Sequence, residues 1–156
     1  MLSDAVFCRT LRKSLGADCH FVVAKLANWE AIRRGTSIPT ASLAAKRFEV
    51  GVLASFTDWI EAGMLSPSVI GMVVPAGLDD GQQLIQASLE RFSFIDPWSR
   101  TRQVSLQVAV VSVDLGGFAS LDDLFQKVSE RLDLACSRFP DEWRSLNRAE
   151  TWCTEA

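Results

Sequence analysis

The amino-acid sequence predicts an α/β (α+β) sandwich, in which helices cover a mostly antiparallel central sheet. Two observations predict this fold class. Segments with helical spacing of apolar residues alternate along the chain with short, β-branched apolar runs. Two of those runs are separated only by Ser66-Pro67-Ser68, and so short a connection joins antiparallel strands. One sheet with helices packed on it satisfies both observations.

The first elements are a helix, a strand and a second, short helix. Apolar residues recur at helical spacing over 4–15. The run HFVVAKL, at 20–26, is short and rich in β-branched residues, which predicts a strand. Residues 28–34 favour a short helix that stops at Gly35.

The middle of the chain is expected to hold a long helix and a hairpin. Residues 36–40, TSIPT, are typical of a loop, and 42–56 then has the spacing of a helix. Two apolar segments, 59–65 and 69–74, form the antiparallel hairpin. We expect Trp29 and Trp59 to lie in elements that build the core.

Three elements are expected after the hairpin. Residues 78–94 predict a helix with acidic residues at its positive end. The clearest strand is VSLQVAVVSV, at 104–113, before the break at Gly116-Gly117. A final amphipathic helix over 121–138 is capped by Ser120 and ends before Pro140.

Composition excludes several function classes. The apolar share of 48% is enough for a core, and the net charge of −3 gives no general attraction to nucleic acid. No apolar run has the roughly 18 residues of a membrane span, and no leader is apparent, so we expect no membrane insertion and a cytoplasmic location. The four cysteines show no C-x-x-C spacing and are expected to be buried or incidental thiols. We therefore expect no metal and no cofactor.

The order of elements, with the closing strand, the Gly-Gly break and the S-L-D-D-L-F helix start, resembles the GGDEF domain of the diguanylate cyclases. That family condenses two GTP molecules into cyclic di-GMP. The final segment 104–135 is the best match. Residues 25–33, KLANWEAIR, stand in place of the family's D-x-D-x-F-K-x-I-N strand signature. Counting forward without a gap places the GGDEF pentapeptide on SPSVI, at 66–70, five residues before Pro75.

The resemblance implies that the active-site residues have been replaced. In active members, the first aspartate of D-x-D and an acid of the pentapeptide hold two divalent cations against the triphosphate. Lys25 stands at the first of these positions, and Ser68 and Val69 stand where the acid should be. An ammonium group repels a metal ion, and a valine has no oxygen with which to bind one. The replaced active-site positions are Lys25, Ala27, Arg33, Ser66, Pro67, Ser68, Val69 and Ile70.

Other functional positions of the family are also replaced. The guanine-binding asparagine corresponds to Arg33, and the phosphate-binding lysine of the last helix corresponds to Cys136. The arginine and aspartate of the inhibitory product site correspond to Thr57 and Ile60. Neither residue reproduces the bidentate contacts of an arginine. The resemblance therefore implies a degenerate, catalytically inactive domain.

Two functions of such a domain remain open at this stage. The first is a protein-interaction or regulatory subunit, with Trp98, Trp143 and Trp152 as candidate partner-binding residues and a homodimer as one possible state. The alternative is a nucleotide effector that binds cyclic di-GMP or GTP through unusual basic residues. The candidates for this less favoured role are Lys25, Arg33, Arg100, Arg102 and Arg138. An enzyme of unrelated chemistry is a third, weaker hypothesis, because Cys19 and His20 are adjacent and would point to opposite faces of a strand.

The predicted domain organisation is simple. Residues 1–140 form the GGDEF-like domain, and 141–156 form a C-terminal amphipathic helical tail. The family's opening D-x-L-T segment is missing, so we expect a free-standing domain. The resemblance suggests a bacterial setting related to cyclic di-GMP, in polysaccharide, biofilm or motility control.

Overall fold

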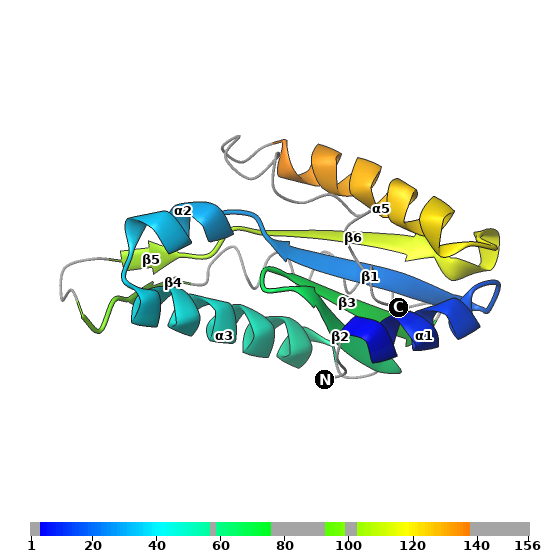
Figure 1. Ribbon diagram of the computed structural model, residues 1–156, viewed down its shortest axis with the longest axis horizontal. Coiled ribbons are helices and arrows are strands. Elements are labelled where there is room, and N and C mark those ends of the chain that lie inside the picture. The colour runs from blue at the N-terminus through cyan, green and yellow to red at the C-terminus, as the bar shows by residue number, and fades with distance from the viewer. Residues whose placement is uncertain (1–3, 57–58, 76–92, 99–102, 138–156) are drawn as a thin grey trace.

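The computed structural model describes residues 4–56, 59–75, 93–98 and 103–137, and a four-stranded antiparallel sheet lies at its centre (Figure 1). The strands are β1 (Cys19–Leu26), β2 (Glu61–Ser66), β3 (Val69–Pro75) and β6 (Val108–Asp114). Their order across the sheet is β2-β3-β1-β6. The predicted α/β sandwich is confirmed.

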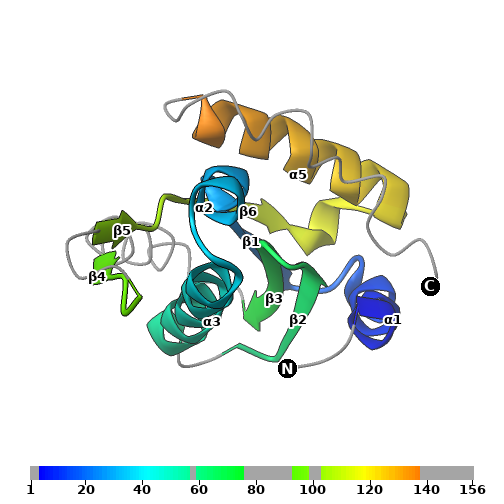
Figure 2. The same ribbon diagram turned by 60° about the vertical axis from the view of Figure 1, so that its left-hand side comes forward.

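Helices cover both faces of this sheet, and each face has its own core (Figure 2). One face is packed by α1 (Asp4–Ser14) and α5 (Leu121–Cys136). The opposite face is packed by α2 (Trp29–Gly35) and α3 (Ile38–Ser55). Alternate residues of each strand enter opposite cores, because successive side chains of a strand point to opposite faces.

β1 is an inner strand, and its position fixes the candidate site. It pairs with β3 along one edge and with β6 along the other, both antiparallel. Six consecutive residues of β1, from Phe21 to Leu26, are buried. A strand paired on both edges and covered on both faces needs the continuous apolar sequence that predicted it. Lys25 is the exception within that sequence.

Two of the predicted elements differ from the structure in kind or continuity. The strand predicted over 104–113 is interrupted, because β5 (Gln103–Ser105) and β6 are separate strands. The Asn28 side chain lies at the interruption: its Nδ2 donates to the Ser105 carbonyl oxygen (2.7 Å), and its Oδ1 accepts from the Gln107 amide (3.0 Å). The helix predicted over 78–94 lies mostly outside the described residues. Its last residues instead belong to β4 (Ser93–Ile95), which pairs with β5 in a small second sheet.

The long helix α3 begins four residues earlier than predicted. Ser37 is the N-cap, and its side chain accepts a hydrogen bond from the Thr40 amide. Pro39 lies in the first turn, where its fixed φ and missing N–H are compatible with a helix. The segment 36–40 is therefore a helix start rather than a loop.

The last helix follows the prediction closely at its start. After a 3-10 turn, η1 (Leu115–Gly117), the Ser120 side chain accepts from the Asp123 amide and caps α5. α5 ends at Cys136, and the predicted end at 138 lies outside the described residues. None of the described helices combines the length and apolarity needed to cross a bilayer.

Two further expectations need correction. Trp59 precedes β2 and is 37% exposed, so it is not a core residue. Trp29 packs, partly buried, against the α2–α3 core as expected. Cys19 and Cys136 are free thiols, but Cys8 is disulfide-bonded, so the expectation of thiols is wrong at Cys8.

Candidate functional site

The positions that the resemblance assigns to the active site, apart from Arg33, come together where the C-terminal end of β1 meets the β2–β3 hairpin. Lys25 is the direct cross-strand partner of Val69 on β3 and of Ala109 on β6. The Leu26 amide donates to the Ser68 carbonyl oxygen (2.8 Å). The hairpin turn lies at Ser66-Pro67-Ser68, as the sequence predicts. Two segments forty residues apart in the sequence thus form one site.

This site is filled by side chains. Val69 and Ile70 are completely buried, and Ala27 and Ser68 are nearly so. Val69 and Ala27 belong to the core under α1 and α5, whereas Ile70 faces the opposite core. Pro67 is exposed at the tip of the turn, and Ser66 is half-buried, with its Oγ 3.4 Å from the Ser68 amide. Two of the pentapeptide positions are therefore ordinary apolar core positions.

Lys25 carries a buried ammonium group into the same site. Its side chain is only 4% exposed. Burial lowers the pKa of Lys25 to about 8, because the charged form loses its hydration. Electrostatic interactions with Cys136 and with the Glu30 carboxylate partly oppose this shift in the pKa of Lys25, so both side chains lie near the ammonium. The end of α5 therefore meets Lys25 at the position where the resemblance places a phosphate-binding lysine.

Arg33 is engaged by its own helix. Its Nε donates to Glu30 Oε1 (3.1 Å), and its Nη2 donates to Glu30 Oε2 (2.6 Å). Arg34 Nε lies 3.3 Å from the same carboxylate. The hydrogen bond from Arg33 holds the pKa of Glu30 below its ordinary value, and the pKa of Arg33 is raised in turn. The guanidinium is exposed to solvent, but its bidentate face is occupied.

The remaining predicted residues do not join this site within the part of the chain that is described. Ile60 is 52% exposed before β2, and Trp98 is on the surface of another part of the molecule. The following predicted residues and the tail 141–156 lie outside the described residues: Thr57, Arg100, Arg102, Arg138, Trp143 and Trp152.

Trp98 is one of three exposed large apolar side chains on segments that lie next to each other, and the sequence predicted only this one as a binding residue. Trp98 is 59% exposed, Ile95 is 66% exposed and Ile38 is 84% exposed. The buried Asp96 carboxylate joins their segments: its Oδ1 accepts from Thr40 Oγ1 (2.8 Å) and from the Trp98 amide (2.9 Å). We call Ile38, Ile95 and Trp98 the tryptophan patch. Residues 96–98 form a turn, and the Asp-Pro pair at 96–97 is the sequence signal that could have predicted it.

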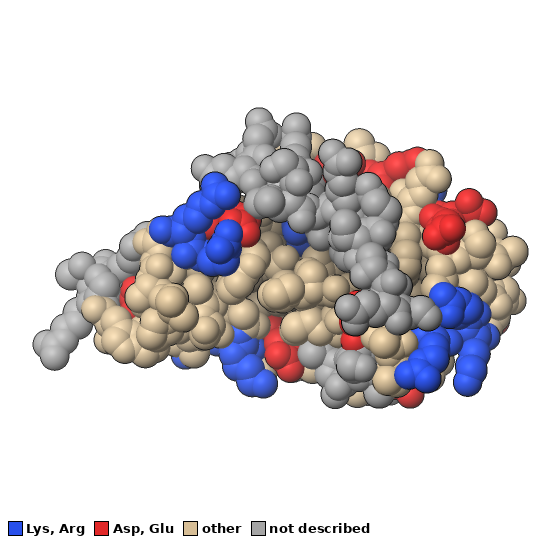
Figure 3. All heavy atoms as spheres, in the orientation of Figure 1, with Lys and Arg blue, Asp and Glu red and all other residues tan. Residues whose placement is uncertain are grey.

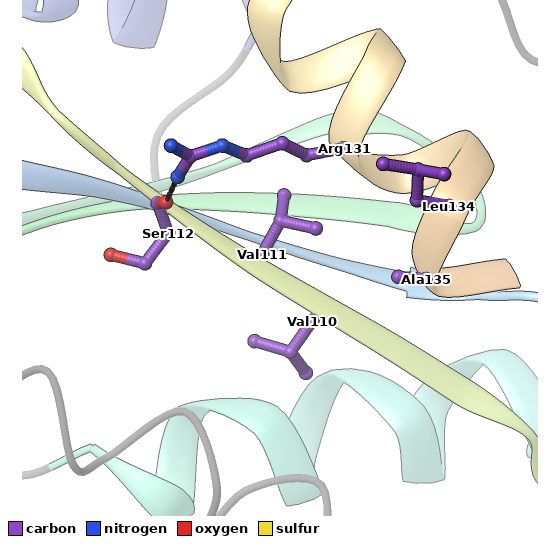
Figure 4. Close-up of a pocket in the computed structure, with 6 residues that line it drawn as sticks. All are labelled: Val110, Val111, Ser112, Arg131, Leu134 and Ala135. Carbon is purple, nitrogen blue, oxygen red and sulfur yellow. Dashed lines mark hydrogen bonds between the residues drawn. The ribbon is translucent and has the colours of Figure 1, made fainter.

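Two hollows of about 260 Å³ each open on the described surface. One lies between α2 and β5 and is lined by Asn28, Ala31, Ile32, Thr36, Gln103, Val104 and Ser105. The other lies between β6 and α5, where Arg131 reaches over and donates to the Ser112 carbonyl oxygen (Figure 4). Its other lining residues, Val110, Val111, Leu134 and Ala135, offer no side-chain polar group. Neither hollow contains a replaced active-site position.

The donor chemistry of the site does not suit a divalent cation. Within the described ranges, no group of three or more His, Cys, Asp or Glu residues could hold a metal ion. The hairpin turn offers only the neutral hydroxyls of Ser66 and Ser68 and no carboxylate, and the nearby Lys25 carries an ammonium, whereas magnesium sites in proteins use carboxylate oxygens. Among the described residues, the buried Gln107 Oε1 has no hydrogen-bond partner, but a single oxygen does not make a binding site for a divalent cation.

Comparison with solved structures identifies the fold. The GGDEF domain of FimX from Pseudomonas aeruginosa superimposes with a TM-score of 0.74 and 10% identity, over 89% of this chain and 91% of that one. The diguanylate cyclase SiaD, solved with its activator SiaC from Pseudomonas aeruginosa, gives 0.62 and 10%, over 85% of this chain and 52% of that one. The active GGEEF domain of a Vibrio cholerae diguanylate cyclase gives 0.51 and 13%, over 81% and 84%.

The likeness lies in the structure and not in the sequence. No protein-family model matches the sequence, and no curated protein matches it either. At such low identities the matches establish the fold alone. The resemblance predicted from the order of elements is confirmed at that level: the chain has the fold of a GGDEF domain.

Proposed function

We propose that this protein is a degenerate, catalytically inactive GGDEF-like domain that acts as a protein-interaction or regulatory subunit. Its setting is a cytoplasmic, cyclic di-GMP-related pathway of a bacterium, such as polysaccharide, biofilm or motility control. The domain spans residues 1–140, and residues 141–156 form an accessory tail.

The observation that carries the proposal is the filled site beside the hairpin. Cyclase chemistry needs carboxylates that hold divalent cations against a triphosphate. Here a buried ammonium, Lys25, pairs across the strands with the completely buried Val69. A metal ion at this place would meet a positive charge and an apolar wall.

The nucleotide-effector alternative has less support from the same geometry. Lys25 is too buried to serve as an open phosphate contact, and the fork of Arg33 is held by Glu30. A nucleotide would have to displace that ion pair and open the packed site. Both changes cost free energy before any contact is gained.

The tryptophan patch supports a protein partner. Large apolar side chains that stay exposed together mark interaction sites more often than isolated ones do. The Trp98 backbone is held by the hydrogen bond to Asp96, so the segment that carries the indole is already ordered before a partner binds. Among the structural relatives, SiaD was solved in complex with a protein activator.

Two measurements on the full-length protein test the proposal. The first incubates the protein with GTP and either Mg²⁺ or Mn²⁺ and separates the nucleotides by chromatography. An active diguanylate cyclase is the positive control. The second titrates cyclic di-GMP and GTP calorimetrically. We expect no product and no saturable heat. Cyclic di-GMP formation that is lost in Lys25→Ala would overturn the proposal.

The partner-binding half of the proposal needs its own test. The tagged protein is used to capture partners from a bacterial lysate, in parallel with Trp98→Ala and with Val50→Ala as a matched surface control. Val50 is 54% exposed on α3. We expect Trp98→Ala to lose a partner that the wild type and Val50→Ala retain. Equal capture by all three would remove the tryptophan patch from the proposal.

A further inference from the structure

The outer face of α1 carries a cluster of basic side chains. Arg9, Arg12 and Lys13 are all exposed, and their spacing of three and four residues places them on one side of the helix. The opposite side, with Phe7 and Leu11, is completely buried against the sheet. None of the three cations forms an ion pair with another described residue. Figure 3 shows basic side chains gathered over α1 at one end of the molecule.

Acidic side chains gather at the same end. Asp18 follows α1, Asp114 ends β6, and Asp122 and Asp123 lie in the first turn of α5. All four are exposed and form no ion pair with another described residue. The turn after α1 is bound to η1, since the Gly16 amide donates to the Leu115 carbonyl oxygen (2.8 Å). A basic and an acidic surface therefore lie next to each other without neutralising each other.

Small residues separate the two surfaces. Gly16, Gly116 and Gly117 are exposed where the turn after α1 meets η1. A Cβ placed on Gly117 would find no atom within 4 Å, so the space outside it is open. Another backbone could approach Gly117 closely, because the space outside it is open.

We propose that this end of the molecule binds a second copy of the chain about a two-fold axis. The α1 cations of each copy face the aspartates of the other, and the glycine surfaces meet near the axis. An isologous interface requires a self-complementary surface, and adjacent patches of opposite sign provide one. This interface lies away from the filled site beside the hairpin and does not depend on the proposed function.

The charges favour a second copy over other occupants. Three cations are few for an anionic membrane or a nucleic acid, whose binding strength grows with each neutralised charge. The net charge of −3 also repels such polyanions. A second copy satisfies the aspartates as well as the cations, which an acidic ligand does not.

Sedimentation velocity of the full-length protein tests the interface. At about 50 mM salt we expect a concentration-dependent dimer, which dissociates at about 500 mM because surface charges are then screened. The basic-reversed variant (Arg12→Glu with Lys13→Glu) and the acidic-reversed variant (Asp122→Lys with Asp123→Lys) should each be monomeric, with association weakened roughly tenfold or more. A monomeric wild type at low salt would overturn the proposal.

Combining the reversals separates docking from damage to the helices. The variant with all four changes restores opposite signs across the axis and should dimerise. It does so although its glutamates lie at the C-terminus of α1 and its lysines at the N-terminus of α5, where each is unfavourable to the helix dipole. An equimolar mixture of the basic-reversed and acidic-reversed variants should form a heterodimer, because one copy is then predominantly acidic and the other predominantly basic at this end. Failure of both combinations would overturn the proposal.

Two further variants control for net charge and for shape. Arg34→Glu with Lys46→Glu changes the net charge as much as the basic-reversed variant does, but on α2 and α3, and should leave the dimer intact. Gly117→Trp adds bulk into open space and should keep the monomer folded while abolishing the dimer. A dimer that survives Gly117→Trp would show that the glycine surfaces of the two copies do not meet, and would overturn this interface.

Discussion

Lys25 shows how one residue sets the chemistry beside the hairpin. In the family that this chain resembles, a metal ion supplies positive charge beside the hairpin, and carboxylates hold it. Here the ammonium group of Lys25 supplies the positive charge from within the strand. Its burial at 4% exposure makes this charge costly, because the interactions with Cys136 and Glu30 offset only part of the lost hydration. The region around Lys25 and Val69 is part of the protein interior.

Replacing Lys25 by methionine should stabilise the protein at neutral pH. The pKa of Lys25 falls from 10.5 to about 8 on folding. Below about pH 8 both states are protonated, and the folded state bears the full cost of the buried charge, about 3 kcal/mol at most. Between pH 8 and 10.5 the unfolded state binds more protons, so the stability of the wild type rises with pH. The free energy of unfolding of Lys25→Met should therefore exceed that of the wild type at pH 7, and the gap should close toward pH 10.5.

Urea denaturation at pH 7, 8.5 and 10 measures this gap. Lys46→Met is the matched control, since Lys46 is exposed on α3 and its pairing with Glu49 is a surface contact. A gap between Lys25→Met and the wild type that does not change with pH would show that burial does not perturb the titration of Lys25.

At the scale of elements, two glycines let α1 pack on the sheet. Gly63 of β2 and Gly71 of β3 are direct cross-strand partners. A Cβ at Gly63 would lie 2.4 Å from Cβ and Cγ of Phe7, and one at Gly71 would lie 2.9 Å from the rings of Phe7 and Phe21. Phe7 of α1 thus occupies the space that side chains at positions 63 and 71 of the hairpin would fill.

Gly63→Ala should consequently destabilise the fold. The new methyl group collides with the part of Phe7 nearest its backbone, so the helix itself must shift, at a cost of about 1–3 kcal/mol. Gly117→Ala is the control, because its Cβ meets open space and should change stability by less than about 0.5 kcal/mol. Thermal denaturation compares the two variants. Equal melting temperatures would mean that α1 adjusts without cost.

Comparing the predicted and observed helices and strands shows which structural features can be read from the sequence. Apolar spacing located the four sheet strands and the described helices, because burial on one or two faces imposes a period on the sequence. The start of α3 was missed because Pro39 is favourable in a first helical turn and in a loop alike. The break between β5 and β6 depends on Asn28, almost eighty residues away, and no local pattern reports such a contact.

For the molecule as a whole, the order of elements was more informative than any motif. That order predicted the GGDEF fold although no family model matches the sequence. It also placed Lys25 next to Val69, because the spacing between strands is set by the architecture. The pairing of Arg33 with Glu30 was not foreseen, although their spacing of three residues on a helix permits it. The tryptophan patch needed the fold, since Ile38 and Trp98 are sixty residues apart.

The two proposed surfaces lie toward opposite ends of the sandwich, with the turn after α1 at one end and β4 with the start of α3 at the other (Figure 1). Mutations at distant sites without shared contacts act independently. Trp98→Ala should therefore reduce partner capture and leave the sedimentation of the dimer unchanged, whereas the basic-reversed variant should be monomeric and still capture the partner. Measuring both properties on both variants tests this independence. If the basic-reversed variant also lost the partner, the partner would recognise the dimer, and the two surfaces would have to be treated as one assembly.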